Sequence, residues 1–130
     1  MNRKAPIEVW TRERCFITEL LNSAEFPEVS VARCRVEPGI TTEAHRLAVT
    51  ECYVILEGSG LMRRADEAPF AVAAGTTVVI PQQMTQCITN TGPDDLIFLC
   101  ICTSRFTPDC YTPVLNQEEF NDVWSESNKQ

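Results

Sequence analysis

The chain has 130 residues and a formal net charge of −7 at neutral pH. This length suits one domain that buries about two-thirds of the surface of its unfolded chain. The acidic balance and the scattered Lys and Arg residues exclude a nucleic-acid partner, because phosphate binding needs a basic face. We therefore expect residues 1–130 to form one domain that does not bind nucleic acid.

The seven cysteines do not follow a zinc-binding pattern, since no C-x-x-C occurs and the tightest spacing is Cys100-x-Cys102. The first ten residues lack the apolar core of a signal peptide. No apolar run is long enough to span a bilayer. We therefore expect a cytoplasmic protein without a membrane partner. Its cysteines are expected to be reduced, and most of them to be small buried hydrophobic residues.

The N-terminal part, residues 1–28, is predicted to form an arm with strands. Ile7 and Val9 alternate as in an edge strand, and residues 14–21 are rich in β-forming types. Residues 29–36 alternate clearly, which places small side chains on one face and Arg33 and Arg35 on the other. The small side chains are expected to point inward and the arginines outward.

The rest of the chain is divided by glycines, prolines and polar turns into short, evenly spaced pieces. Strands are expected at residues 53–56, 61–64, 70–73, 76–80, 86–89 and 96–102. Residues 96–102 are apolar on both faces and are predicted to form a central strand. No long helical pattern interrupts this series, which indicates an all-β sandwich or barrel.

One short helix is expected at the C-terminus, over about residues 116–126. Asn116 and Glu119 have the spacing of an N-cap and its capping-box partner. Phe120, Val123 and Trp124 follow at helical spacing and predict one apolar packing face.

Two segments, Gly39–Gly58 and Gly75–Asn90, resemble the two sequence motifs of the cupins. The matching positions agree in residue type and in spacing; they are Gly39, His45, Glu51, Gly58, Gly75, Pro81 and Asn90. The resemblance extends over about residues 29–105. It implies a double-stranded β-helix, or jelly-roll, barrel in which the two segments face each other across one pocket.

The same resemblance implies a divalent metal held by three histidines and one glutamate, and here the chain departs from the motifs. Leu47 and Gln86 stand where two of the histidines belong, and Gln83 replaces a glycine. His45 is the only histidine in the chain. Within one protomer, this excludes a three-histidine site and the two-histidine site typical of non-haem iron.

The remaining candidate metal ligands are His45, Glu51 and Gln86. An imidazole, a carboxylate and an amide oxygen suit Mn, Fe, Zn or Ni, but bind them more weakly than three imidazoles do. The alternative is a polar pocket without metal. In that case Glu51 needs another partner, because an unpaired buried carboxylate is costly.

Alternation along extended strands predicts which neighbouring side chains face the pocket. Tyr53 lies two residues after Glu51 and shares its face, as a candidate catalytic group, a fourth ligand or a wall of the pocket. Cys52 and Cys87 fall on the opposite faces of their strands and are expected outside the pocket. Whether Cys100 and Cys102 face the pocket stays open at this point.

Two functions from different classes follow. The first is a metal-dependent enzyme acting on a small organic molecule, by isomerase, lyase or dioxygenase chemistry, with Glu51 as a catalytic candidate. The second is a non-catalytic pocket, without metal, that binds a small molecule. In either case we expect a homodimer, in which the Ile7–Val9 arm pairs with the sheet edge of a second copy.

Overall fold

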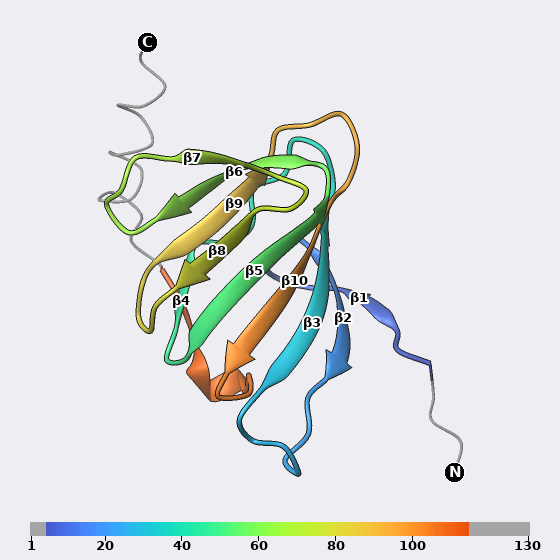
Figure 1. Ribbon diagram of the computed structural model, residues 1–130, viewed down its shortest axis with the longest axis vertical. Helices are drawn as coiled ribbons and strands as arrows, with labels where there is room; N and C mark the ends of the chain where they lie inside the picture. Colours follow the sequence, from blue (N-terminus) through green and yellow to red (C-terminus); the bar gives the residue numbers. More distant parts are fainter. Residues whose placement is uncertain (1–4, 115–130) are drawn as a thin grey trace.

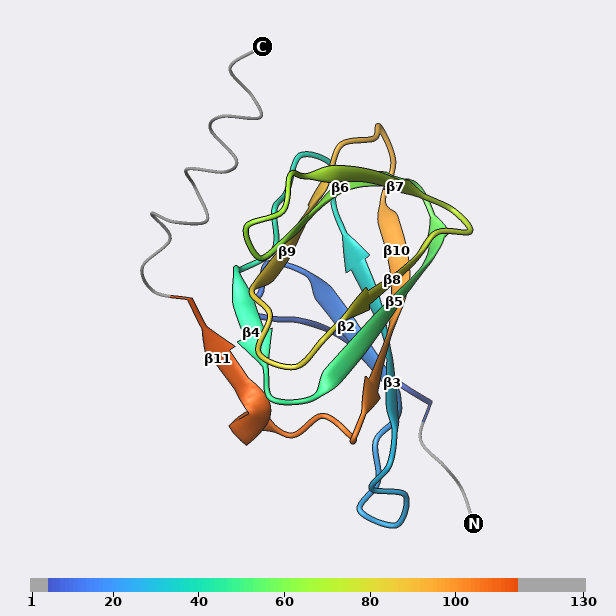
Figure 2. The ribbon, with the colours of Figure 1, turned by 60° about the vertical axis from the view of Figure 1, so that its left-hand side comes forward.

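The computed structural model describes residues 5–114, which form two antiparallel sheets facing each other as a barrel (Figure 1 and Figure 2). In order across the first sheet, the strands are β1 (Glu8–Trp10), β2 (Phe16–Leu21), β3 (Ser30–Val36), β10 (Leu96–Thr103), β5 (Thr50–Glu57) and β8 (Thr77–Ile80). The second sheet consists of β11 (Tyr111–Pro113), β4 (His45–Leu47), β9 (Gln86–Asn90), β6 (Ser59–Arg64) and β7 (Phe70–Ala73). The expected all-β jelly-roll barrel is therefore confirmed.

Strand β3 shows how alternation in the sequence becomes the inner and outer surfaces of the barrel. Cys34 and Val36 are buried on the inner face. Arg35 lies on the outer face, where its guanidinium forms ion pairs with Glu8 at 2.8 Å and Asp95 at 3.1 Å. The predicted facing of this strand is confirmed. The central position of β10 is confirmed as well, since it pairs with β3 on one side and β5 on the other.

Two turn positions adopt left-handed backbone conformations for different reasons. Gly58 (φ +86°) joins β5 to β6, and a Cβ atom there would lie 2.7 Å from the carbonyl oxygen of Asp95. Glycine is therefore required at this crossing between the sheets. Gln83, which replaces a glycine of the second motif, also has a positive φ of 64°. Gln83 thus adopts a left-handed conformation that a glycine would adopt at lower cost.

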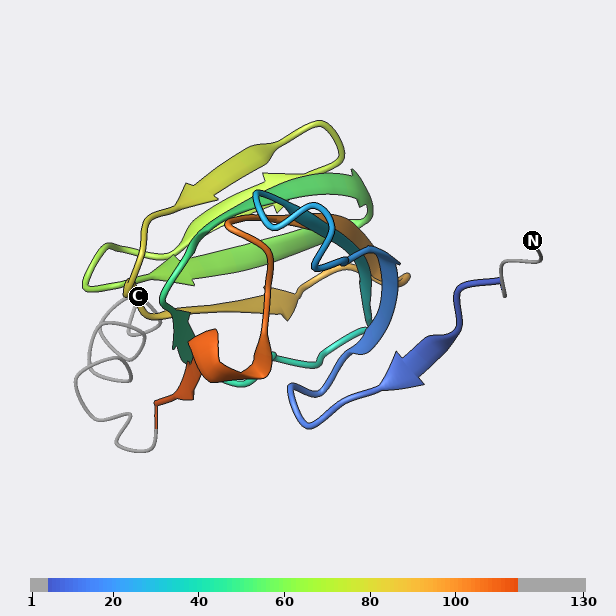
Figure 3. The ribbon, with the colours of Figure 1, turned by 90° about the horizontal axis from the view of Figure 1, so that it is seen from below.

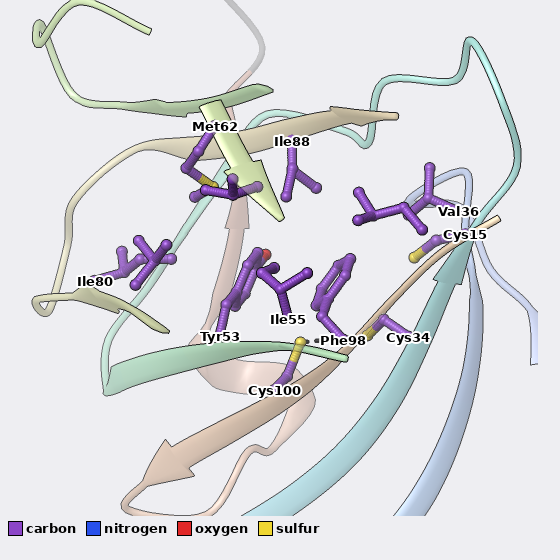
Figure 4. Close-up of a cluster of buried hydrophobic side chains, with 13 residues drawn as sticks. Cys15, Cys34, Val36, Tyr53, Ile55, Met62, Ile80, Ile88, Phe98 and Cys100 are labelled. Atoms are coloured by element: carbon purple, nitrogen blue, oxygen red, sulfur yellow. Dashed lines mark hydrogen bonds between the residues drawn. The ribbon is translucent and has the colours of Figure 1, made fainter. Parts of the chain in front are cut away.

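The core fills the space between the sheets with aliphatic and aromatic side chains, together with Cys15, Cys34 and Cys100 (Figure 4). Asn90, the last residue of the second motif, is 1% exposed. Its Nδ2 donates to the carbonyl oxygens of Val36 and Asp94, both at 2.8 Å, and its Oδ1 accepts from the Gly92 N–H at 2.9 Å. Asn90 therefore holds a turn together and takes no part in the pocket.

Some elements differ from the sequence-based expectations. Strand β5 begins at Thr50, three residues before the expected start, and β2 begins at Phe16, because Arg14 sits in a turn with φ 65°. The short strands β4 and β11 were not predicted; they pair with each other at the edge of the second sheet. The predicted helix at residues 116–126 lies outside the described residues.

Strand β1 is an edge strand that extends away from the barrel (Figure 3). It carries exposed apolar side chains, since Ile7 is 72% and Trp10 is 52% exposed. The chain after β10 crosses the end of the barrel to reach the 3-10 turn η1 (Pro108–Cys110) before β11 (Figure 3). Within residues 5–114, no helix has the length and apolar character needed to cross a membrane.

Candidate functional site

A cavity of about 450 Å³ opens into the barrel between the two sheets. Its wall is built by the inner faces of β3, β5 and β10, by β4 and β11 of the second sheet, and by the β1–β2 arm. His45, Glu51 and Tyr53 all line it. The two motif segments face each other as expected, the first through β4 and β5 and the second through β9. A cavity of this size suits a small organic molecule.

Glu51 is the buried carboxylate of this cavity. It lies on β5 and is only 6% exposed. Its Oε1 accepts a hydrogen bond of 2.8 Å from Gln86 Nε2, and its Oε2 lies 3.8 Å from the Cys102 thiol. No ion pair to Glu51 forms within the described part of the chain. Burial therefore raises the pKa of Glu51 to about 7, even though the hydrogen bond from Gln86 favours the ionised form.

His45 lies on β4 and is held as a neutral imidazole. Its Nδ1 lies 2.8 Å from the carbonyl oxygen of Glu43, which can only accept, so Nδ1 carries the proton. Its ring stacks on Tyr111 with 4.7 Å between ring centroids. Burial lowers the pKa of His45 below its ordinary value. The unprotonated Nε2 is therefore available as an acceptor or a metal ligand.

Gln86 lies on β9 directly opposite His45 in the strand register and is fully buried. Because its Nε2 donates to Glu51, its Oε1 is turned away from that bond. This Oε1 has no hydrogen-bond partner among residues 5–114. A buried acceptor without a donor is costly, but Gln86 does not line the cavity, so a ligand atom could reach Oε1 only if the side chain moved.

Tyr53 lines the same cavity and packs as a wall. Its ring stacks on Phe98 with 4.6 Å between centroids, and it is 3% exposed (Figure 4). Burial, with the charge of Glu51 nearby, raises the pKa of Tyr53 well above its ordinary value. Tyr53 therefore stays a neutral phenol, which can offer a hydrogen-bond donor to a ligand but cannot act as a base.

The candidate metal ligands can be tested for fit against this geometry. His45 and Gln86 are cross-strand neighbours, and Gln86 is hydrogen-bonded to Glu51, so the three side chains lie together. His45 Nε2 and Glu51 are suitable donors, whereas Gln86 now turns its N–H group to Glu51. To serve as a ligand, Gln86 would have to give up this hydrogen bond and rotate its amide so that Oε1 is presented instead. No group of three His, Cys, Asp or Glu side chains placed to hold a metal occurs within residues 5–114.

The cysteines divide between the cavity and the rest of the structure. Cys100 and Cys102, whose facing the sequence left open, both line the cavity, whereas Cys52 and Cys87 do not, as their alternation predicted. Cys100 Sγ lies 3.3 Å from Cys34 Sγ (Figure 4), and all seven cysteines are free. Burial raises the pKa of the Cys100 and Cys102 thiols, so they add a neutral, polarisable surface to the wall.

Glu13 is a cavity residue that the sequence did not reveal. It lies in the turn before β2, and its side chain lines the cavity. Burial, together with the negative charges of Glu51 and Glu43, raises the pKa of Glu13 to about 7. No local pattern marks Glu13, because its position depends on how the β1–β2 arm folds over the barrel. Glu43 itself accepts a hydrogen bond from the Tyr111 hydroxyl at 2.5 Å.

Comparison with known proteins agrees with this architecture. The sequence model of the Cupin domain family matches residues 32–102. A search of curated protein sequences found no match. The polyketide cyclase RemF from Streptomyces resistomycificus has a similar structure, with a TM-score of 0.73, 18% identity, and coverage of 92% of this chain and 89% of that one.

Two further solved structures show the same fold. An uncharacterised protein with a double-stranded β-helix domain from Klebsiella pneumoniae gives a TM-score of 0.70 at 12% identity, with coverage of 82% of this chain and 89% of that one. Oxalate decarboxylase from Bacillus subtilis gives a TM-score of 0.72 at 16% identity, and the match covers 92% of this chain but only 34% of that one. At these identities the structures show a shared fold and do not define an activity. The family match over residues 32–102, together with the two-sheet barrel, shows that this chain belongs to the cupin-domain family.

Proposed function

We propose that this cupin binds a small organic molecule in the cavity and transforms it by general acid–base chemistry, with Glu51 as the proton-transfer group. The observation that carries the proposal is the Glu51 carboxylate itself, which is 6% exposed, lines a cavity of about 450 Å³ and has no cationic partner among the described residues. A structural carboxylate is normally paired when it is buried. An acid–base group benefits from this environment, because it brings the pKa close to the working pH.

The neighbouring residues each have a defined part in this proposal. With a pKa of about 7, Glu51 is present in both forms near neutral pH and can accept or deliver a proton. Gln86 donates to Oε1 and so fixes the orientation of the carboxyl group. Oε2, whose neighbour is the Cys102 thiol, is the oxygen left for the reacting proton. His45 Nε2 can accept a second hydrogen bond from the bound molecule.

A second candidate function is a divalent-metal site formed by His45, Glu51 and Gln86. It is favoured by the unpaired Gln86 Oε1 and by the fixed tautomer of His45, which together leave two lone pairs beside a carboxylate. A metal bound there, Mn, Fe, Zn or Ni, would polarise a substrate oxygen as a Lewis acid. In that case Glu51 would serve as a ligand and the pocket would hold the substrate against the apolar wall.

The alternative to both is a non-catalytic binding pocket, in which Glu51 and His45 only recognise a ligand. Solved neighbours are named for activities or shown with small molecules, as in polyketide cyclase RemF and CapF with 3-isopropenyl-tropolone. These neighbours support a small organic ligand for the cavity. At identities of 18% and 20% they share the fold with this chain.

Two further proposals concern the state of the protein. The exposed edge strand β1, with Ile7, Val9 and Trp10 uncovered, supports a homodimer formed by pairing of this edge with a second copy. The seven free cysteines support a reducing compartment such as the cytoplasm. Sedimentation at micromolar concentration tests the first of these, since a monomer alone would contradict it.

Metal content separates the two candidate functions. Untagged protein purified without chelator is analysed by inductively coupled plasma mass spectrometry, beside the His45→Ala and Gln86→Ala variants, whose folding is checked by circular dichroism. Near-stoichiometric metal that is lost in both variants supports the metal site. A protein that stays free of metal after incubation with Mn, Fe, Ni and Zn supports acid–base chemistry at Glu51. Ligands from a compound screen are then followed for turnover in the wild type and in Glu51→Gln, and turnover that is equal in both contradicts the proposed role of Glu51.

A further inference from the structure

Two acceptor atoms that line the cavity, Glu51 Oε2 and His45 Nε2, can each take a donor from a ligand, beside the Tyr53 hydroxyl as a donor. Glu51 Oε2 has a weak thiol donor in Cys102 at 3.8 Å, and the Cys100 thiol is also a partner of the carboxylate. Gln86 Oε1 also lacks a partner within residues 5–114, but Gln86 is fully buried and does not line the cavity. His45 Nε2 carries a lone pair, because Nδ1 donates to the Glu43 carbonyl oxygen. A molecule that pairs with Glu51 Oε2 and His45 Nε2 must therefore bring donors.

The charged side chains of the cavity also favour a ligand that brings donors, because they are all acidic. Three glutamates, Glu13, Glu19 and Glu51, line it, and no Lys or Arg does so within the described part of the chain. The arginines of β3 project from the outer face, where Arg35 is paired with Glu8 and Asp95. Glu51 is the buried member of the three, so an anionic ligand would meet its carboxylate without a lining cation to balance it, whereas a cation would be attracted.

The remaining wall of the cavity suits the organic part of such a molecule. Two stacked ring pairs border it, Tyr53 with Phe98 and His45 with Tyr111, at 4.6 and 4.7 Å between centroids. Aromatic faces attract both apolar groups and cations.

We propose that the natural ligand of this cavity is an organic ammonium compound, a small molecule with a protonated nitrogen on an apolar or aromatic body. The protonated nitrogen would donate to Glu51 and to His45 Nε2, and the body would lie against the aromatic wall. This inference rests on the proposed function, which makes the cavity the ligand site. It extends that function by assigning the charge of the ligand and by excluding small carboxylates as ligands.

Three probes of one shape and different charge test the inference: benzylamine, benzyl alcohol and benzoate. Binding to the full chain, treated with chelator, is measured by isothermal titration calorimetry at about pH 8, where Glu51 is ionised and benzylamine is protonated. We expect benzylamine to bind at least about tenfold more tightly than benzyl alcohol, and benzoate to bind most weakly.

Two variants locate the source of this preference. Glu51→Gln keeps the shape of the side chain and its hydrogen bond with Gln86, and it should reduce the affinity for benzylamine to that for benzyl alcohol. Glu57→Gln makes the same charge change at the exposed far end of β5, about 20 Å along the strand, and should leave all three affinities unchanged.

The outcomes separate the inference from the function on which it rests. Benzyl alcohol or benzoate binding as tightly as benzylamine would overturn the inference, while leaving the cavity as a ligand site. A preference for benzylamine that survives Glu51→Gln would also overturn it. If none of the three probes binds, the proposed ligand site fails and the inference fails with it.

Discussion

Replacing Glu51 by Gln should make the protein more stable at alkaline pH, which is unusual for a polar residue of a functional site. Burial raises the pKa of Glu51 from its ordinary value of 4.5 to about 7. Between these values the folded state holds a proton that the unfolded state has released, so the stability of the wild type falls as pH rises. A rise of about 2.5 in pKa corresponds to about 3 kcal/mol.

The magnitude follows from the isosteric change. Gln at position 51 still accepts the hydrogen bond from Gln86 but cannot ionise, so it avoids the cost of a buried charge. We expect Glu51→Gln to raise the free energy of unfolding by about 3 kcal/mol at pH 8, and by less than about 1 kcal/mol at pH 5. Loss of the negative charge also relieves Glu13, whose pKa Glu51 helps to raise, and this acts in the same direction.

The assay is urea unfolding followed by circular dichroism at pH 5 and pH 8, with reductant and chelator present. The exposed Glu57→Gln variant is the matched control and should follow the wild type at both pH values. A gap between Glu51→Gln and the wild type that is the same at both pH values would refute the reasoning. The reasoning would also be refuted if the wild type were more stable than Glu51→Gln at pH 8, because Glu51 would then be paired with a cation.

Three further substitutions test the backbone and the polar core, each by urea unfolding. Gln83→Gly should raise the free energy of unfolding by about 0.5–1 kcal/mol because the position has φ 64°, whereas Gln82→Gly should lower it; equal effects of the two would contradict this. Gly58→Ala should cost about 2 kcal/mol or more, since its Cβ would lie 2.7 Å from the Asp95 carbonyl oxygen; a neutral result would show that the crossing can shift. Asn90→Ala should cost about 2–4 kcal/mol through the three hydrogen bonds lost by a buried side chain, without changing binding in the cavity; a change in ligand affinity would place Asn90 in the site.

The sequence carried enough information for the barrel because its strands alternate and its turns are marked. The facing of β3 and the central position of β10 followed from side-chain periodicity alone. The short strands β4 and β11 could not be predicted in this way, because three residues are too few to show a period. Their pairing depends on a long-range contact across the barrel end.

The same distinction applies to the site. The resemblance to the two cupin motifs implied that His45, Glu51 and Gln86 lie together. The strand register pairs His45 with Gln86, and a hydrogen bond joins Gln86 to Glu51. Glu13 could not be found, because a turn between two arm strands brings it to the cavity and no local pattern records that. The orientation of the Gln86 amide was also beyond the sequence, since it depends on the charge of Glu51.

The most direct test of this account is the pKa of Glu51 in the folded, chelator-treated protein. The side-chain carboxyl carbons of glutamate are labelled with ¹³C and titrated by NMR, and the signal that disappears in Glu51→Gln assigns the residue. The account predicts a midpoint near 7, as expected for a carboxyl group buried in the cavity without a cation. A midpoint at the ordinary value near 4.5 would contradict it, because Glu51 would then be solvated or paired and would have no special fitness for proton transfer near neutral pH.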